Sequence, residues 1–272
     1  MRRVPLGDRL RAYGRALRFV LYMVWTRVRF GLQLRLGADL LTLQHTAKLR
    51  VSRRILRILG VTPYWAGALP PKRGPRLIVA NHRAALDIGV LMTRFGGVFL
   101  SRADLERWPI IGTLARQGET IFVDRADRNS GARAIRAIRR RLGEGHTVIV
   151  FPEGTTYRGD EVRPFLAGAF AAARGLDVEV VPVGLAYPPG TEYVDTDFVS
   201  HVRGVAARPQ TPVCVQIGAP FAMEGRAGEV AAEAREAVQA LVEKARARLE
   251  AVAPTPDLER RGRLPRRALR SE

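Results

Sequence analysis

The spacing of apolar residues divides the chain into two regions that meet near Pro63. Apolar residues recur at helical spacing over residues 10–28, and Arg11, Arg15, Arg18 and Arg29 fall on the opposite side, so this segment predicts an amphipathic helix. A second amphipathic helix is predicted over about residues 38–59. The first region, 1–62, is therefore expected to be a two-helix segment.

Beyond residue 63, short β-rich runs alternate with amphipathic stretches. The expected strands lie at residues 76–80, 97–101, 120–124, 147–151, 178–186 and 212–218, and the expected helices at 85–95, 111–117, 130–142, 165–173 and 225–252. This alternation is typical of an α/β fold with a mixed, largely parallel sheet flanked by helices. It predicts an α/β domain over residues 63–252 and a basic, disordered tail over 253–272.

The chain carries a large excess of basic residues, which indicates an anionic partner. The net charge is +19, and residues 1–57 carry 14 basic and two acidic side chains. The charge-free apolar stretch 19–26 would reach only about 12 Å, against a hydrocarbon core of about 30 Å, so it cannot span a bilayer. We expect it to lie on an anionic membrane surface with Phe19, Tyr22 and Trp25 at headgroup depth.

The alternative is a helical hairpin packed on the main domain with its arginines facing solvent. A secretory signal fits poorly because Arg18 interrupts the apolar run. We therefore expect a peripheral or monotopic protein at the cytoplasmic face of a membrane, in a bacterium the inner membrane. Nucleic acid is the rival anionic partner, but the sequence has no zinc-ligand spacing, no RNA-binding strand motif and no basic strip interleaved with aromatic residues.

Residues 81–87, Asn-His-Arg-Ala-Ala-Leu-Asp, place a histidine after a predicted buried strand and an aspartate in the first turns of a helix. Across this turn Asp87 can hold one imidazole nitrogen of His82 as a donor and leave the other to accept a proton. The segment contains no Ser or Cys, so the nucleophile is expected to be a hydroxyl of the substrate. A helix-capping Asp beside a structural His would account for the same residues.

Three further segments lie at predicted strand ends. One ends in Asp124-Arg125; another is Phe-Pro-Glu153-Gly154-Thr-Thr, whose turn could present backbone N–H groups to an anion. The third puts Pro182 in an apolar run, which an edge strand or bulge tolerates and a central strand resists. Taken singly, each is explained as well by a surface pair or an ordinary turn.

Together and in this order, these blocks resemble those of the glycerolipid acyltransferase family, the PlsC-like lysophospholipid acyltransferases that include 1-acyl-sn-glycerol-3-phosphate acyltransferases. The likeness covers about residues 76–220. The matching blocks are Asn81-His82 with Asp87 (an HX4D motif), Gly118 to Arg125, Phe151 to Thr155, and Val181-Pro182-Val183.

The resemblance implies a membrane-associated O-acyltransferase in which His82 is the general base and Asp87 orients it. The acyl donor would be acyl-CoA or acyl carrier protein, a co-substrate, with no metal or other cofactor. The four histidines of the chain also lack metal-ligand spacing. The resemblance assigns substrate binding to Asn81, Arg102, Asp124, Arg125, Glu153, Gly154, Thr155, Thr156, Arg158 and Pro182.

One position departs from the family pattern. Many phosphatidate-forming members carry arginine directly after Gly-Thr, where this chain has Thr156, a hydroxyl without charge. Arg158 or Arg163 could compensate, and the resemblance then implies 1-acyl-glycerol-3-phosphate as acceptor and phosphatidic acid as product. The alternative is another lysolipid, such as lyso-ornithine lipid or a lysophospholipid.

Overall fold

The computed structural model describes the chain except for residues 1–4, 38, 103–119, 124–126, 128 and 253–272. The described strands form one sheet: β1 (Val61–Ala66), β2 (Arg76–Ala80), β3 (Val98–Arg102), β4 (Ile121–Val123), β5 (Thr147–Val150), β6 (Glu179–Ala186), β7 (Thr211–Ile217) and β8 (Phe221–Ala222). Their order is β1-β7-β6-β2-β5-β3-β4, and β8 also pairs with β6. β7 and β8 run antiparallel to β6, and the other pairs are parallel.

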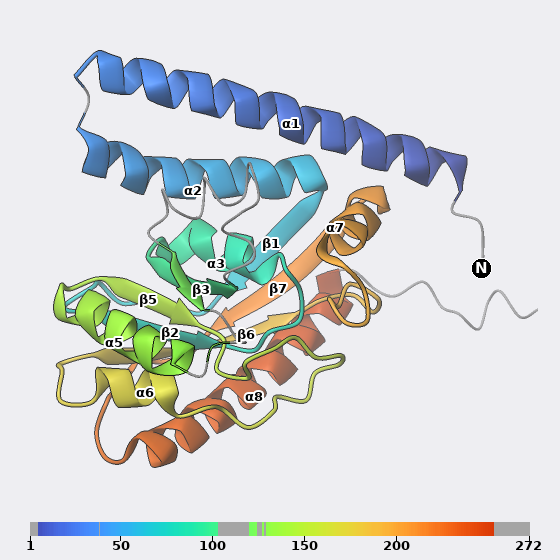
Figure 1. Cartoon of the computed structure of the whole chain (residues 1–272). Helices are drawn as coiled ribbons and strands as arrows, with labels where there is room; N and C mark the ends of the chain where they lie inside the picture. Colours follow the sequence, from blue (N-terminus) through green and yellow to red (C-terminus); the bar gives the residue numbers. More distant parts are fainter. Residues whose placement is uncertain (1–4, 38, 103–119, 124–126, 128, 253–272) are drawn as a thin grey trace, which may run out of the picture.

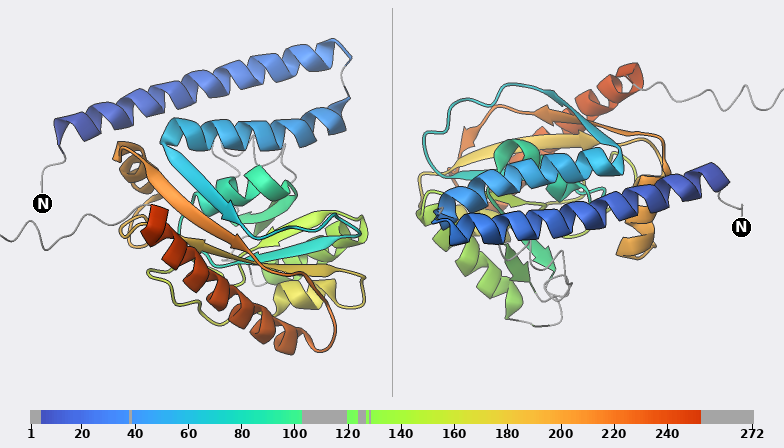
Figure 2. Two further views of the ribbon diagram at one scale, coloured as in Figure 1. Left: turned by 180° about the vertical axis from the view of Figure 1, so that it is seen from behind. Right: turned by 90° about the horizontal axis from the view of Figure 1, so that it is seen from above.

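Helices cover both faces of this sheet (Figure 1). The described helices are α1 (Leu6–Arg35), α2 (Leu40–Leu59), α3 (Asp87–Phe95), α5 (Ser130–Gly143), α6 (Gly168–Ala173), α7 (Phe198–Ala207) and α8 (Ala227–Val252). In Figures 1 and 2, α2, α3 and α7 lie on one face and α5, α6 and α8 on the other, with α1 outermost over α2. The predicted fold class, a mixed and largely parallel sheet flanked by helices, is confirmed.

The two faces of β2 show why its sequence is continuously apolar over residues 77–80. Ile78 and Ala80 pack into the cluster under α2 and α3, whereas Leu77 and Val79 pack into the cluster under α5 and α8. Because successive side chains of a strand point to opposite faces, a strand covered on both sides must be apolar at every position. β2 is therefore held rigidly at the centre of the molecule, and its carboxyl end supports the candidate site.

Most predicted elements are present within a few residues of their expected bounds, but the sequence reading missed β1, β8 and α7. The helix expected at 111–117 and the tail 253–272 lie outside the described residues. The predicted boundary at 62/63 falls inside β1, which pairs with β7 along its whole length. Pro63 marked that boundary, yet β1 is an edge strand, where proline is tolerated.

α2 also belongs to the main fold. Its Leu56 and Leu59 are buried in the central core, and a side chain at Gly89 of α3 would press against Leu56. The expected segment 1–62 is therefore not a separate unit, and of its two helices α1 is the one that lies outermost.

Pro182 lies in an interior strand but at a gap in its pairing. β6 pairs with β8 at Glu179 and Val180 and with β7 from Val183 onward. The carbonyl of Pro182 accepts a hydrogen bond from the Gly218 backbone N–H at 2.9 Å. The N–H that proline lacks would have pointed to the same side, where the partner of β6 changes from β8 to β7. The strand tolerates the proline because no partner residue is paired there on that side.

Arginines on the inner side of α1 attach it to the domain. Arg15 donates hydrogen bonds to the carbonyl oxygens of Leu59, Ala206, Arg208 and Pro209, at 2.6 to 3.1 Å. Arg11 donates to the carbonyl of Ala207 at 2.6 Å. These carbonyls end α2 and α7, where a cation is favoured by the helix dipole.

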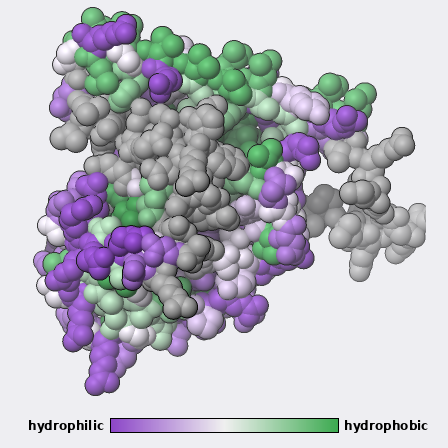
Figure 3. All heavy atoms as spheres, in the orientation of Figure 1, coloured by the Kyte–Doolittle hydropathy of each residue, from purple (hydrophilic) through white to green (hydrophobic). Residues whose placement is uncertain are grey.

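The apolar side of α1 faces away from the protein. Its side chains are 39 to 69% exposed: Leu6, Leu10, Tyr13, Leu17, Val20, Leu21, Val24, Trp25, Val28, Leu32 and Leu34. Figure 3 shows apolar residues gathered over α1. A hairpin with solvent-facing arginines, the alternative drawn from the sequence, would place α1 the other way round, because a surface helix of a globular protein normally turns its apolar side inward. No helix in the described residues is long and apolar enough to span a bilayer.

Candidate active site

The site begins where β2 ends. Asn81 is fully buried; its side-chain amide donates to the carbonyl of Leu185 at 2.9 Å, and the Leu185 N–H donates back to its Oδ1 at 2.8 Å. These two bonds fasten the end of β2 to β6. Asn81 was expected to bind substrate, but its amide is occupied within the protein and instead fixes the backbone from which His82 projects.

His82 and Asp87 meet as the sequence predicts. Nδ1 of the imidazole lies 2.7 Å from Oδ2 of Asp87, and this carboxylate is fully buried at the first residue of α3. The same oxygen accepts backbone N–H bonds from Arg83 at 2.7 Å and Ala84 at 2.9 Å. Asp87 therefore holds the turn and the ring together, and Nε2 is the nitrogen left to accept a proton.

An aromatic ring fixes the plane of the imidazole. The His82 ring stacks on Phe151 with centroids 4.1 Å apart and an angle of 11° between the planes. Phe151 directly follows β5, the parallel neighbour of β2, so both rings stand at the carboxyl edge of the sheet. The histidine side chain is 19% exposed, in contrast to the buried Asp87. The base is thus oriented on two sides and still reachable.

Glu153 and Arg83 form a buried ion pair behind the histidine. Arg83 Nη1 lies 2.8 and 3.1 Å from the two carboxylate oxygens, and both side chains are at most 3% exposed. Glu153 also accepts the backbone N–H of His82 at 2.8 Å and that of Arg163 at 3.1 Å. Glu153 was expected to bind substrate; its bonds instead tie the loop after β5 to the backbone of the base.

The rest of that loop is more exposed. The hydroxyl of Thr156 donates to the carbonyl of Tyr193, Arg158 pairs with Asp195 at 3.1 Å, and the Arg163 guanidinium lies 5.5 Å from the Tyr157 ring centroid. Gly154 adopts a positive φ of 77° that favours glycine. Thr155 is exposed. Charged groups of both signs therefore border the loop that the sequence assigned to the acceptor.

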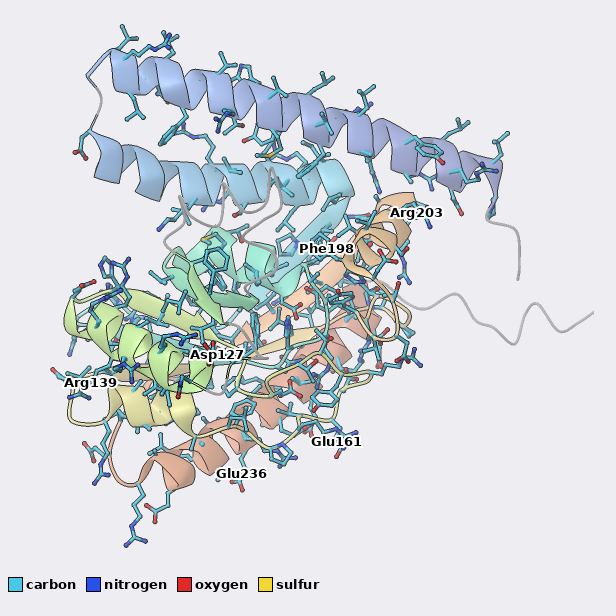
Figure 4. The ribbon with its side chains drawn as sticks, viewed as in Figure 1. Asp127, Arg139, Glu161, Phe198, Arg203 and Glu236 are labelled. Carbon is cyan, nitrogen blue, oxygen red and sulfur yellow. The ribbon has the colours of Figure 1, made fainter. Side chains whose placement is uncertain are left out.

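Three expected residues are not placed. Asp124 and Arg125 lie outside the described residues, and Arg102 ends β3 with a side chain that is not described. Nearby, Asp127 accepts the Asn129 N–H at 2.8 Å and pairs with Arg133 at the start of α5. Figure 4 places Asp127 at one end of α5 and Arg139 toward the other.

Sequence reasoning missed two residues that position the base, Arg83 and Phe151. Arg83 directly follows His82, and Phe151 precedes the Pro-Glu-Gly turn, so both lay inside segments already singled out. The spacing of residues in the sequence reveals neither contact. An arginine-glutamate pair or a ring stack between residues 68 or more positions apart forms only through the order of the strands. Among the described residues, no three His, Cys, Asp or Glu side chains are grouped to hold a metal ion.

Comparison with known proteins identifies the family of this chain. The sequence pattern of the family described as Acyltransferase matches residues 67–186. A lyso-ornithine lipid O-acyltransferase of Pseudomonas aeruginosa is 33% identical over 179 residues, 61% of this chain and 67% of that protein. A 1-acyl-sn-glycerol-3-phosphate acyltransferase of Neisseria meningitidis is 27% identical over 144 residues, 53% of this chain and 56% of that protein.

A solved structure shows the same fold. The crystal structure of the 1-acyl-sn-glycerophosphate (LPA) acyltransferase PlsC from Thermotoga maritima matches with a TM-score of 0.67 and 24% identity, over 88% of this chain and 95% of that one. The matches to the sequence relatives are shorter and span between half and two thirds of most of these relatives. On its sequence match and its paired His82 and Asp87, the chain belongs to the acyltransferase family, alongside lyso-ornithine lipid and 1-acyl-sn-glycerol-3-phosphate O-acyltransferases.

Proposed function

We propose that this protein transfers a fatty acyl group from an acyl thioester to the free hydroxyl of a lysolipid, with His82 as general base. The observation that carries the proposal is the 2.7 Å contact between Nδ1 of His82 and the buried carboxylate of Asp87. It fixes one tautomer of the ring and stabilises the imidazolium that forms when Nε2 takes a proton.

In the proposed reaction the hydroxyl oxygen of the lysolipid attacks the thioester carbonyl carbon while Nε2 of His82 accepts its proton. The new C–O ester bond forms, the C–S bond breaks, and the imidazolium returns the proton to the departing thiolate. The products are the acylated lipid and a free thiol, so atoms and charge balance. The donor is acyl-CoA or acyl carrier protein, and no other cofactor takes part.

The test is acyl transfer by purified protein to lysolipids in vesicles, with labelled acyl-CoA and acyl carrier protein compared as donors. Replacing His82 by Gln should abolish transfer, because the amide has the size of the ring but cannot take up the proton. Unfolding by heat should remain cooperative, which separates lost chemistry from a lost fold. Turnover by His82→Gln at the wild-type rate would exclude the assigned role.

For the acceptor, our first proposal is 1-acyl-glycerol-3-phosphate, which would give phosphatidic acid. Arg158 and Arg163, in the loop after β5, are the described cations that could hold its phosphate, and the Neisseria relative bears the corresponding name. Lyso-ornithine lipid is the second candidate. It is supported by the uncharged Thr156, by the pairing of Arg158 with Asp195, which offers both signs of charge, and by the Pseudomonas relative.

A single substitution separates these acceptors. Thr156→Arg adds a cation directly after Gly-Thr and should raise kcat/KM for phosphate-bearing lysolipids relative to the others. Thr155→Arg adds the same charge one residue earlier and serves as the matched control. An unchanged preference over a panel of lysolipids in Thr156→Arg would place this position outside the headgroup site.

We further propose that α1 lies in the surface of an anionic membrane, peripherally and at the cytoplasmic face. The support is its exposed apolar side together with the arginine contacts that hold the opposite side against α2 and α7. Trp25 is half exposed, stacks with Tyr22 at 5.8 Å and lies under Arg29 at 5.2 Å, a combination suited to the headgroup layer. This placement would bring lipid acceptors to the protein within the bilayer surface.

A further inference from the structure

Only one carboxylate oxygen of Asp87 has partners. Oδ2 accepts three hydrogen bonds, from His82, Arg83 and Ala84. Oδ1 is buried and has no partner that meets hydrogen-bond geometry. A buried carboxylate oxygen without a partner destabilises the folded protein, so a nearby donor is favoured to bond to it.

The side chain nearest to this role is Tyr187. Its hydroxyl is also buried without a partner, and the residue is only 2% exposed. Tyr187 directly follows β6, two residues beyond Leu185, which Asn81 fastens to the end of β2. The phenol therefore stands at the same sheet edge as the catalytic pair. Burial and, second, the charge of the nearby Asp87 raise the pKa of the Tyr187 phenol well above its usual range.

His201 is the other group to which the Tyr187 hydroxyl could donate a hydrogen bond. Its Nε2 is likewise buried without a partner, and the charge of Asp87 acts on it too. Burial is the main influence on His201 and lowers its pKa, so its ring is neutral at pH 7. A carboxylate is the stronger acceptor for a phenol, because a hydrogen bond to an ionised group is roughly twice as strong as one between neutral groups.

We propose that Tyr187 is a positioning residue whose hydroxyl donates a hydrogen bond to Oδ1 of Asp87 and so keeps Oδ2 facing Nδ1 of His82. Both atoms are buried without another partner, so a bond between them would satisfy both groups. Without it, only the bonds on Oδ2 oppose rotation of the carboxylate about its last bond, and the partner of the imidazole is held less firmly. This inference rests on the proposed role of His82 as base.

The test is Tyr187→Phe, which removes one oxygen and leaves the ring. We expect kcat to fall about tenfold, the value of a hydrogen bond to a charged group, with KM for donor and acceptor unchanged. In an Asp87→Asn background the same change should cost little more, because the charged acceptor is already gone. Tyr64→Phe is the control: Tyr64 packs beside Cys214, away from the catalytic pair.

A wild-type kcat in Tyr187→Phe, or an equal loss with and without Asp87, would overturn the inference, since a purely structural tyrosine would act independently of Asp87. Neither outcome touches the proposed function, which depends on His82→Gln. A second measurement leaves Tyr187 unchanged: its slowly exchanging hydroxyl proton should resonate downfield in the wild-type protein and move upfield in Asp87→Asn. An unmoved resonance would also refute the bond.

Discussion

At the residue scale, Asp87 serves two structures at once. Its Oδ2 holds the imidazole of His82 and closes the turn through the N–H groups of Arg83 and Ala84. Asp87→Asn should therefore lower kcat at least a hundredfold, because a neutral amide cannot stabilise the imidazolium that forms during transfer. Steady-state rates with saturating donor and acceptor measure this loss. Glu144→Gln, in an exposed pair with Arg140 at the end of α5, is the matched control and should stay near wild type.

For the buried pair of Arg83 and Glu153, the prediction concerns the stability of the fold and not the rate of transfer. Glu153→Gln leaves the Arg83 charge buried without its counter-ion, so the free energy of unfolding should fall by about 3–5 kcal/mol. Denaturant titration measures this change. Arg158→Ala breaks a pair whose side chains are 67 and 78% exposed and should cost at most about 1 kcal/mol. Equal losses in the two variants would show that Glu153 does not brace the site.

The burial of His201 leads to a prediction of how the free energy of unfolding changes as pH falls. Burial lowers its pKa in the folded protein, so the folded state favours the neutral ring. As pH falls below about 6.5, the unfolded chain takes up a proton that the folded protein resists. The stability contributed by the neutral ring is thus present above that pH and is lost as pH falls toward the folded pKa. His201→Gln should lose less stability between pH 8 and pH 5 than wild type; a larger loss would contradict this account.

The sequence predicted the residues that lie close together in the chain and misjudged those joined by strand order. His82 and Asp87 are five positions apart, so one turn brings them together. Asn81 and Glu153 were singled out as substrate-binding residues, but nothing in their spacing shows that Asn81 meets Leu185 or that Glu153 meets Arg83. Their partners are 70 or more positions away and become neighbours only when β2 lies between β5 and β6.

At the element scale, strands covered on both faces were the easiest to predict. β2 and β6 have five and eight residues, and each is apolar after its first residue. β1 was missed because Thr62, Pro63 and a half-exposed Trp65 interrupt its apolar pattern, which an edge position allows. α7 was missed because its ten residues include Gly204 and offer less than three turns of periodicity. Edges and short helices take their conformation from neighbours that the local sequence does not specify.

The orientation of α1 could be read from the sequence only as two alternatives. Periodicity separated its apolar and arginine sides, but both a membrane helix and a packed hairpin have two such sides. The carbonyl groups that Arg15 binds come from α2 and from residues 206–209, so the orientation of α1 depends on tertiary contacts that the sequence does not show. Gly60 belongs to this arrangement, since a Cβ there would lie 2.3 Å from the Arg15 guanidinium.

The exposed side of α1 gives the prediction at this scale. Leu17 and Val24 are 60 and 57% exposed, so replacing both with Glu should leave the free energy of unfolding nearly unchanged. If these side chains enter lipid, each contributes about 1.5 kcal/mol or more to the free energy of membrane binding. The two substitutions together should therefore lower partitioning into vesicles about a hundredfold. Vesicle co-sedimentation measures this. Val252→Glu, at the end of α8, is the control and should partition like wild type; equal partitioning of all three proteins would exclude α1 as the membrane contact.

At the scale of the whole molecule, the candidate site and the proposed membrane helix lie in different parts of the fold. The catalytic pair stands at the carboxyl edge of the central strands, while α1 lies outside the layer of α2, α3 and α7 (Figure 2). Parallel strands flanked by helices make such an edge the natural place for a site. α2 packs with α3, the helix that begins at Asp87, so α1 is joined to the site through one layer of helices. A lipid acceptor held in the membrane surface would need to travel only this depth.

The net charge of +19 makes the final prediction, on how the whole protein finds its membrane. Basic residues near an anionic surface contribute about 1 kcal/mol each, and salt shortens their reach from about 10 Å at 0.1 M to about 3 Å at 1 M. Binding to anionic vesicles should therefore weaken steeply with salt and level off at the affinity for neutral vesicles, which α1 sets through apolar contact alone. In the Leu17→Glu, Val24→Glu protein this residual affinity should fall by the same factor of about a hundred while the salt-sensitive part remains. Equally salt-dependent binding to duplex or single-stranded nucleic acid, at comparable strength, would show that the charge does not select a membrane.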